Sequence, residues 1–242
     1  MVKKISLIMF IGLLFVSCFL DSQVAIGNSN STQIENDEKI IYLTFDDGPS
    51  VMTDKVLDVL KKSDVKATFF IIGNQIKGQE AVVKRIYTEG HSIGLHTYTH
   101  TYKNIYSTRK GFISEMLKSQ NEINSLIGIK PTIMRFPSGS RKHLTNAFLE
   151  ELHSYNFKIY DWNAVMSDGI NCKTPTDKLY REATKTTVSE HPIILLMHCD
   201  YMHKNTCKVL PRVIKFYKDN GYEFKIINDK TPENYFPIKS SK

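Results

Sequence analysis

The residues best suited to chemistry in this sequence are Asp46-Asp47 and the pair His96 and His100. Two adjacent carboxylates repel each other unless a cation or a proton intervenes, and a metal ion bound by one of them would resolve that conflict. Histidines four residues apart place both imidazoles on one side of a helix, where a third ligand completes a zinc site with one position open for water. The alternative for the aspartates is a helix cap with a solvated neighbour. The two groups together favour a metal site of the catalytic kind.

Short apolar runs alternate with helical patterns from residue 40 onward, and this alternation predicts a parallel sheet with helices on its faces. Nearly continuous apolar runs are typical of strands that are covered on both faces. A barrel and an open doubly wound sheet would both satisfy the pattern. The expected strands are residues 40–45, 66–72, 91–95, 132–136, 157–160, 192–197 and 222–227, and the expected helices are residues 53–62, 80–89, 111–127, 144–154, 175–189 and 208–220.

Ionisable residues follow five of the expected strands. The carboxyl ends of parallel strands lie on one face of a barrel or open sheet, where active sites are found, so we expect these residues to converge. They are Asp46 and Asp47, His96 and His100, Arg135, Asp161 and His198. Trp162, beside Asp161, is expected either in the core or as a wall for a sugar ring. The histidines without such a context, expected on the surface or in packing, are His91, His143, His153, His191 and His203.

The composition narrows the range of partners. Lys and Arg outnumber Asp and Glu by 32 to 25, which gives a formal net charge of +7. This balance suits an anionic partner, or it simply keeps the protein soluble. The sequence has no basic run with interleaved aromatic residues and no glycine-rich loop, which argues against nucleic acid and against a nucleotide cofactor. Either one disulfide or free thiols are expected among Cys172, Cys199 and Cys207.

Residues 1–20 are expected to send the chain across a membrane. Lys3-Lys4 precede a nearly unbroken apolar run, which is the pattern of a secretory signal. Cleavage, retention as a membrane anchor and lipidation at Cys18 are all compatible with it, and a buried N-terminal helix is the alternative to export. The polar residues 21–38 are typical of a flexible linker. We therefore expect an extracellular or cell-surface protein that contacts the membrane only through this N-terminal segment.

Five short segments resemble the signatures of the polysaccharide deacetylases, the NodB-homology or family-four carbohydrate esterases. The most specific is Thr-Phe-Asp-Asp-Gly-Pro at residues 44–49. The others are His-Thr-Tyr-Thr-His at 96–100, Arg-Phe-Pro at 135–137, Asp-Trp at 161–162 and Leu-Met-His at 196–198. They occur in the family's order and indicate a catalytic domain over residues 39–230, followed by a C-terminal tail at 231–242. The resemblance implies an α/β fold, an irregular (β/α)7-type barrel.

The resemblance also implies which residues carry out the reaction. Asp47, His96 and His100 would hold a divalent metal, most often zinc, with cobalt or another divalent ion as alternatives. Asp46 would be the general base that activates water. His198 would be the general acid that protonates the leaving amine.

Further residues would support these groups or contact the substrate. Arg135 would hold Asp46 in place, and Asp161 would pair with the catalytic charges. The backbone N–H of Ser138 would stabilise the oxyanion, and Leu196 would line the pocket for the acetyl methyl group. The residues expected to contact the substrate are Pro137, Ser138, Trp162 and Leu196.

The function implied is removal of N-acetyl groups from N-acetylglucosamine units of a surface polysaccharide. Peptidoglycan is the leading substrate, and poly-N-acetylglucosamine or chitin oligomers come next. An O-acetyl polysaccharide esterase of the same fold and a non-catalytic glycan-binding module are the alternatives. The sequence does not indicate the oligomeric state, and a monomer is assumed.

Overall fold

The computed structural model of the chain describes residues 38–185 and 192–239. The expected signal or anchor at residues 1–20, with Cys18, and nearly all of the expected linker lie outside the described residues. No helix within the two described ranges is both long enough and apolar enough to cross a lipid bilayer.

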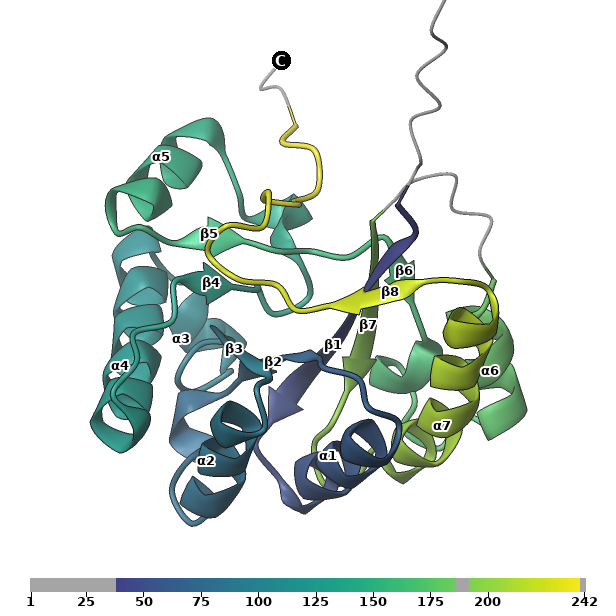
Figure 1. Ribbon diagram of the computed structural model, residues 1–242. Coiled ribbons are helices and arrows are strands. Elements are labelled where there is room, and N and C mark those ends of the chain that lie inside the picture. The colour runs from purple at the N-terminus through teal and green to yellow at the C-terminus, as the bar shows by residue number, and fades with distance from the viewer. Residues whose placement is uncertain (1–37, 186–191, 240–242) are drawn as a thin grey trace, which may run out of the picture. The chain divides into compact units, whose positions relative to one another are not determined.

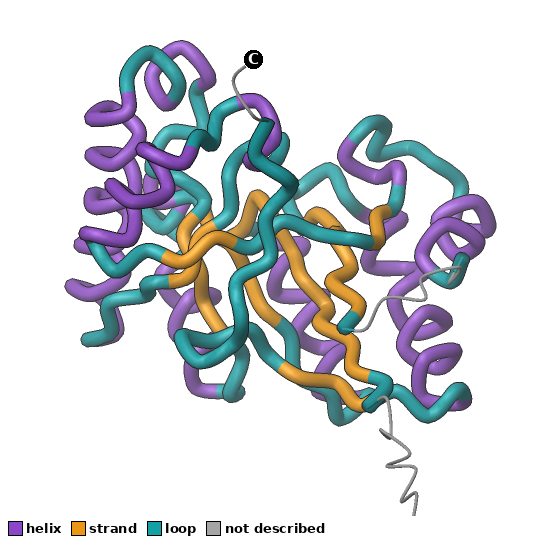
Figure 2. Tube along the Cα trace, turned by 90° about the horizontal axis from the view of Figure 1, so that it is seen from above, coloured by secondary structure: helices purple, strands orange, loops and turns teal. Residues whose placement is uncertain are grey.

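The strands of the described residues form one parallel sheet in the order β5-β4-β3-β2-β1-β7-β6, with β8 beside the start of β1. Figures 1 and 2 show this sheet curved around the centre of the domain. The bounds are β1 Ile40–Gly48, β2 Thr68–Ile71, β3 Ser92–Leu95, β4 Ile133–Met134, β5 Lys158–Ile159, β6 Ala164–Val165, β7 Ile193–His198 and β8 Glu223–Lys225. Seven of them are the expected strands, and the α/β barrel type of fold is confirmed. The short β6 was not predicted.

The helices lie along the outside of the sheet (Figure 2). They are α1 Val51–Lys62, α2 Glu80–Thr88, α3 Tyr102–Ile105, α4 Arg109–Ile127, α5 Asn146–Ser154, α6 Thr176–Ala183 and α7 Lys204–Asp219. The one-turn helix α3 was not predicted. Helix α7 begins four residues earlier than expected, directly after His203.

The core covers both faces of β1, as its continuous apolar sequence predicts. Ile41, Leu43 and Phe45 are fully buried on one face, where the Phe45 ring stacks on Phe69 with centroids 5.2 Å apart. On the other face, Tyr42 belongs to a smaller apolar cluster. Burying a side chain of this size stabilises the fold by about 1.5–3 kcal/mol, so β1 is fixed firmly enough to present the polar residues at its end.

The start of α1 is tied to the end of β7. The Ser50 hydroxyl accepts hydrogen bonds from the N–H groups of Met52 and Thr53, and the Thr53 hydroxyl accepts one from Ser50 N. This capping box satisfies N–H groups that have no partner within the helix. Both hydroxyls also donate to the carbonyl of Cys199, at 2.7 and 3.0 Å. The loop that carries Asp47 is therefore fixed relative to the residue after His198.

The expected boundary at residue 230 is wrong, because the following segment packs on the domain. Asn234 forms a β-bridge with Tyr160, and the Phe236 ring lies edge-on against Trp162 with centroids 5.2 Å apart. Glu233 accepts a hydrogen bond from the N–H of Ile159 at 2.7 Å. The short apolar and aromatic segment after residue 230 lacks the periodicity of a helix or strand, so the sequence did not mark it as part of the core.

Candidate active site

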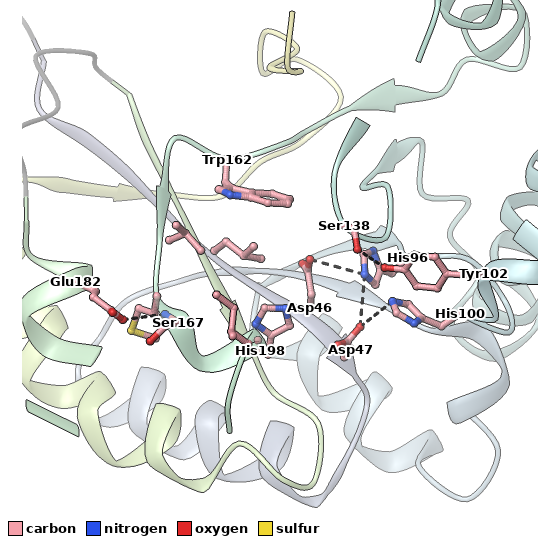
Figure 3. Close-up of a pocket in the computed structure, with 15 residues that line it drawn as sticks. Asp46, Asp47, His96, His100, Tyr102, Ser138, Trp162, Ser167, Glu182 and His198 are labelled. Atoms are coloured by element: carbon pink, nitrogen blue, oxygen red, sulfur yellow. Dashed lines mark hydrogen bonds and ion pairs between the residues drawn. The ribbon is translucent and has the colours of Figure 1, made fainter. Parts of the chain in front are cut away.

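A cavity of 660 Å³ opens at the carboxyl ends of the central strands. Its wall holds five of the residues expected there: Asp46, Asp47, His96, His100 and His198. Figure 3 shows the aspartates between the two imidazoles of the loop after β3 on one side and the imidazole of His198 on the other. The parallel register places Asp46 of β1 directly beside His198 of β7. The predicted convergence is therefore found for these five side chains.

Asp47, His96 and His100 form a group that could hold a metal ion. The Nε2 atoms of both histidines lie 3.4 Å from Oδ1 of Asp47. That carboxylate oxygen is buried and has no hydrogen-bond partner within the described residues. A buried carboxylate oxygen without a partner is costly unless a cation compensates it, and two imidazole nitrogens with one carboxylate are a donor set that zinc accepts. The residues therefore fit a divalent metal.

The tautomer of His96 suits the same role. Its Nδ1 lies 3.0 Å from the carbonyl oxygen of Arg135, which can only accept, so Nδ1 carries the hydrogen and Nε2 keeps a free lone pair. Burial lowers the pKa of His96 below its ordinary value, in spite of the nearby Asp46 and Asp47. The ring is thus neutral at physiological pH, as a metal ligand must be.

His96 and His100 do not lie on a helix, the arrangement in which a spacing of four residues brings two imidazoles to one side. They belong to a loop, in which Thr97 and His100 adopt left-handed conformations with φ of 68° and 52°. One carboxylate oxygen of Glu115 on α4 accepts hydrogen bonds from the N–H groups of Tyr98 and Thr99 and from the Thr99 hydroxyl. These bonds hold a tight turn, so the two imidazoles meet because the backbone folds back.

Asp46 is almost fully buried and is held by Arg135. The guanidinium Nη1 donates to Oδ1 of Asp46 at 2.9 Å and to the Thr44 hydroxyl at 2.8 Å. Arg135 is itself completely buried, and its Nε donates to the carbonyl of Tyr160. Oδ2 of Asp46 lies on the other side of the carboxylate, 3.7 Å from Nε2 of His96. The contact expected between Arg135 and Asp46 is present.

His198 is paired with Asp168, a residue that the sequence analysis missed. Nδ1 of His198 donates to Oδ1 of Asp168 at 3.1 Å, and the His198 N–H donates to Oδ2 at 2.9 Å. Burial alone would lower the pKa of His198, but the bond to Asp168 and the charges of Asp46 and Asp47 raise it to about 9. Asp168 lies in a 3₁₀ turn, Ser167–Gly169, after the two-residue strand β6. It follows no recognisable strand, so the reasoning that found the other residues does not reach it.

Three of the four residues expected to contact substrate line the cavity: Ser138, Trp162 and Leu196. Pro137 is buried and lies outside the lining, and its carbonyl accepts a hydrogen bond from the Tyr106 hydroxyl. Tyr102 of α3 lines the cavity although it was not predicted, and its hydroxyl contacts the Ser138 hydroxyl (Figure 3).

Asp161 does not have the expected contact with the catalytic charges. Its carboxylate accepts hydrogen bonds from the N–H and hydroxyl of Ser140 and from the N–H of Phe236. Only its backbone carbonyl receives a bond from Arg135, at 3.3 Å. Burial raises the pKa of Asp161 more than these hydrogen bonds lower it. Asp161 therefore joins the loop after β4 to the C-terminal segment.

The cysteines of the described residues are free thiols: Cys172, Cys199 and Cys207. Of the two alternatives left open by the sequence, free thiols are found for these three residues.

A curved parallel sheet with this group of acids, bases and candidate metal ligands at its carboxyl edge defines a hydrolase of the α/β barrel type. The family model described as polysaccharide deacetylase matches residues 33–159. The chain belongs to the polysaccharide deacetylase family.

Known members of the family are similar over most of the chain. A peptidoglycan-N-acetylglucosamine deacetylase of Bacillus cereus is 33% identical over 84% of this chain and 73% of its own length. The crystal structure of the polysaccharide deacetylase Bc1974 from Bacillus cereus has a TM-score of 0.74 at 33% identity and covers 83% of this chain and 96% of that one. A Streptococcus mutans CE4 esterase has a TM-score of 0.71 at 31% identity, with 79% and 87% covered.

Proposed function

We propose that this protein removes N-acetyl groups from N-acetylglucosamine units of peptidoglycan at the cell surface, with zinc as its metal. The observation that carries the proposal is the meeting of Asp47, His96 and His100 with Asp46 and His198 in one cavity. The Bacillus cereus relative named for peptidoglycan supports this polymer. A formal net charge of +7 suits an anionic cell wall. Export through residues 1–20 would bring the domain to this substrate.

A divalent metal held by Asp47, His96 and His100 would polarise the acetyl carbonyl and make water a better nucleophile near neutral pH. Asp46 would take the proton from the attacking water. Because Oδ1 of Asp46 is engaged by Arg135, Oδ2 remains to accept that proton. The same bond restrains the carboxylate, so the base is held in position before substrate arrives.

His198 would donate the proton that the leaving nitrogen needs. An amide nitrogen leaves as a neutral amine only if an acid protonates it. With a pKa of about 9, His198 is protonated at neutral pH, and its Nδ1 is occupied by Asp168, so Nε2 is the donating atom. A protonated acid at this position therefore suits the cleavage of an amide.

The other cavity residues would bind the sugar and the developing oxyanion. The Ser138 N–H has no hydrogen-bond partner within the described residues, so it is free to donate to an oxyanion. Leu196 and Trp162 offer an apolar wall for the acetyl methyl group. The ring of Tyr102, beside Ser138, offers a surface on which a sugar can stack.

An O-acetyl esterase is the second candidate, supported by the similarity to the Streptococcus mutans CE4 esterase. The two are separated by incubating the zinc-loaded domain with peptidoglycan and with O-acetylated xylan, and measuring released acetate and new free amines. We expect acetate and amines in equal amounts from peptidoglycan, abolished by a chelator and restored by zinc. Acetate from the ester without amines from peptidoglycan would support the esterase.

The roles of the metal ligands and the base are tested by substitution. His96→Ala should lose both zinc and activity, whereas Asp46→Ala should lose activity and keep zinc. His153→Ala, which removes a half-exposed imidazole on α5, is the matched control and should behave as the wild type. Near-normal activity of Asp46→Ala, or full zinc content of His96→Ala, would contradict the assignment.

A further inference from the structure

A second histidine lies against the ring of His198. His203 directly precedes α7 and is only 5% exposed, so of the two placements expected from the sequence, surface or packing, it has the buried one. The two imidazole rings are roughly parallel, at 25°, with centroids 5.3 Å apart. His203 lines no part of the cavity and has no role in the reaction described above. Its burial beside the proposed acid therefore needs another explanation.

Both ring nitrogens of His203 face oxygen atoms that can only accept. Nδ1 lies 2.8 Å from Oδ1 of Asp200, and Nε2 lies 3.2 Å from the backbone carbonyl oxygen of Asp168. A neutral imidazole has one donor and one acceptor nitrogen, so it can satisfy only one of these partners, whereas the imidazolium satisfies both. The geometry thus favours the charged form of His203. Burial lowers the pKa of His203, but the bond to Asp200 and the charge of Asp200 outweigh this and raise it.

The same contacts hold the turn that carries Asp168. The backbone carbonyl of Asp168 accepts a hydrogen bond from Nε2 of His203. The carboxylate of Asp168 accepts four further hydrogen bonds, from Gly169 N, Thr206 Oγ1 and the Nδ1 and N–H of His198. Asp168 is therefore fixed at both its backbone and its side chain. The position of the His198 ring depends on this turn, because a Cβ atom at Gly169 would overlap that ring.

Asp168, His198 and His203 also lie close enough together to suggest a metal site. However, both nitrogens of His203 already point at oxygen atoms, and Nδ1 of His198 points at Asp168. A metal ion would have to displace these bonds. The observed contacts therefore favour a hydrogen-bonded charge network at this position.

We propose that the Asp200–His203 ion pair is a positioning element for His198, which fixes the turn carrying Asp168 and places a positive charge beside the acid. The proposal rests on the proposed function only in calling His198 the acid. The charged groups that face His198 are Asp168, Asp46, Asp47 and His203, and those that face His203 are Asp200, Asp168 and His198. The cation of His203 opposes the three carboxylates around His198 and so makes its proton easier to release.

The charge state of His203 can be measured directly by NMR of the zinc-loaded protein labelled with ¹⁵N-histidine. We expect both ring nitrogens of His203 to remain protonated above pH 6.5, the ordinary pKa of histidine, with the signals assigned through His203→Gln. A neutral tautomer at neutral pH, or signals of a metal-bound ring, would overturn the proposal. This readout does not depend on activity, so an absence of deacetylation would refute the proposed function alone.

The effect on His198 is tested with His203→Gln and with Asp200→Asn/His203→Gln. Two unit charges 5.3 Å apart, at an effective dielectric constant of about 20–40, shift a pKa by about one to two units. His203→Gln leaves Asp200 unbalanced, so the alkaline limb of kcat/KM should move upward by about one unit or more. The double variant removes both charges, and its limb should fall between those of the wild type and His203→Gln. If kcat falls in both variants but the alkaline limb of kcat/KM does not move, the Asp200–His203 pair has a merely structural role.

Discussion

The hydrogen bond from His198 to Asp168 should control the alkaline limit of activity. Asp168→Asn replaces the carboxylate that accepts four hydrogen bonds by an amide with a single acceptor oxygen. The substitution removes the main interaction that raises the pKa of His198 to about 9, while burial, which lowers it, remains. The charges of Asp46 and Asp47 remain and oppose the effect of burial, so the pKa of His198 should fall towards its ordinary value of 6.5.

The size of the effect follows from the fraction of His198 that carries a proton. At pH 8, a pKa of about 9 leaves roughly 90% of the acid protonated, and a pKa of 6.5 leaves roughly 3%, a loss of about 30-fold. At pH 6 the two fractions differ by only about 1.3-fold. A misoriented ring would add a loss that is equal at both pH values. The defect should thus be about 20-fold larger at pH 8 than at pH 6.

The measurement is kcat/KM on N-acetylated glycan between about pH 5.5 and pH 10, with zinc content determined for each sample. Asp177→Asn is the matched control, because it makes the same change at an exposed carboxylate paired with Arg212. Its profile should match that of the wild type. A profile of Asp168→Asn that runs parallel to the wild type across the whole range would refute the reasoning, since Asp168 would then orient His198 without setting its charge.

Three other substitutions test the surroundings of the site. Arg135→Met leaves the buried carboxylate of Asp46 unpaired, so the free energy of unfolding in urea should fall by about 3–5 kcal/mol. A fall of less than about 1 kcal/mol would contradict the role of the buried pair. Gly169→Ala should displace the His198 ring and lower kcat about 10- to 100-fold at unchanged zinc content, and full activity would show that the turn adapts. Burial lowers the pKa of His91 to about 4, so the folded state keeps it neutral while the unfolded chain binds a proton below about pH 6.5. The folded state is therefore destabilised relative to the unfolded chain as the pH falls towards 4. Between pH 7.5 and pH 5, the free energy of unfolding in urea should fall by about 2 kcal/mol more for the wild type than for His91→Gln. Equal losses in the two proteins would contradict this prediction.

Much of the fold could be predicted because its central strands follow from a simple sequence pattern. A parallel strand covered on both faces needs a continuous apolar run, and β1, β2 and β7 have such runs. The two-residue β6 has no such run, and its Val165 is 47% exposed. The C-terminal segment joins the domain through single contacts, such as Phe236 on Trp162. Interactions of this kind depend on the folded shape and leave no periodic pattern in the sequence.

The residues of the candidate site also fall into those that the sequence predicts and those that it does not. Residues at the ends of clear strands, such as Asp46, His96 and His198, were found because parallel strands bring their carboxyl ends together. Asp168 and His203 were missed because they lie in a turn and at a helix start, whose approach to His198 is fixed by tertiary packing. The spacing of His96 and His100 suggested a shared ligand site through helix geometry, but a loop with two left-handed residues brings the two imidazoles together.

The pairing of β1 with β7 suggests why the proposed base and the proposed acid can work on the same bond. Asp46 and His198 are register partners, so the distance between their backbones is set by the sheet and not by a loop. Arg135 fixes the side chain of one and Asp168 fixes the side chain of the other, and these two supports come from different strand ends and turns. Because the supports are independent, substitution of Arg135 and of Asp168 should impair different steps, namely activation of water and protonation of the leaving amine. The sheet thus fixes the separation of the two groups, while separate buried partners set the orientation and charge of each.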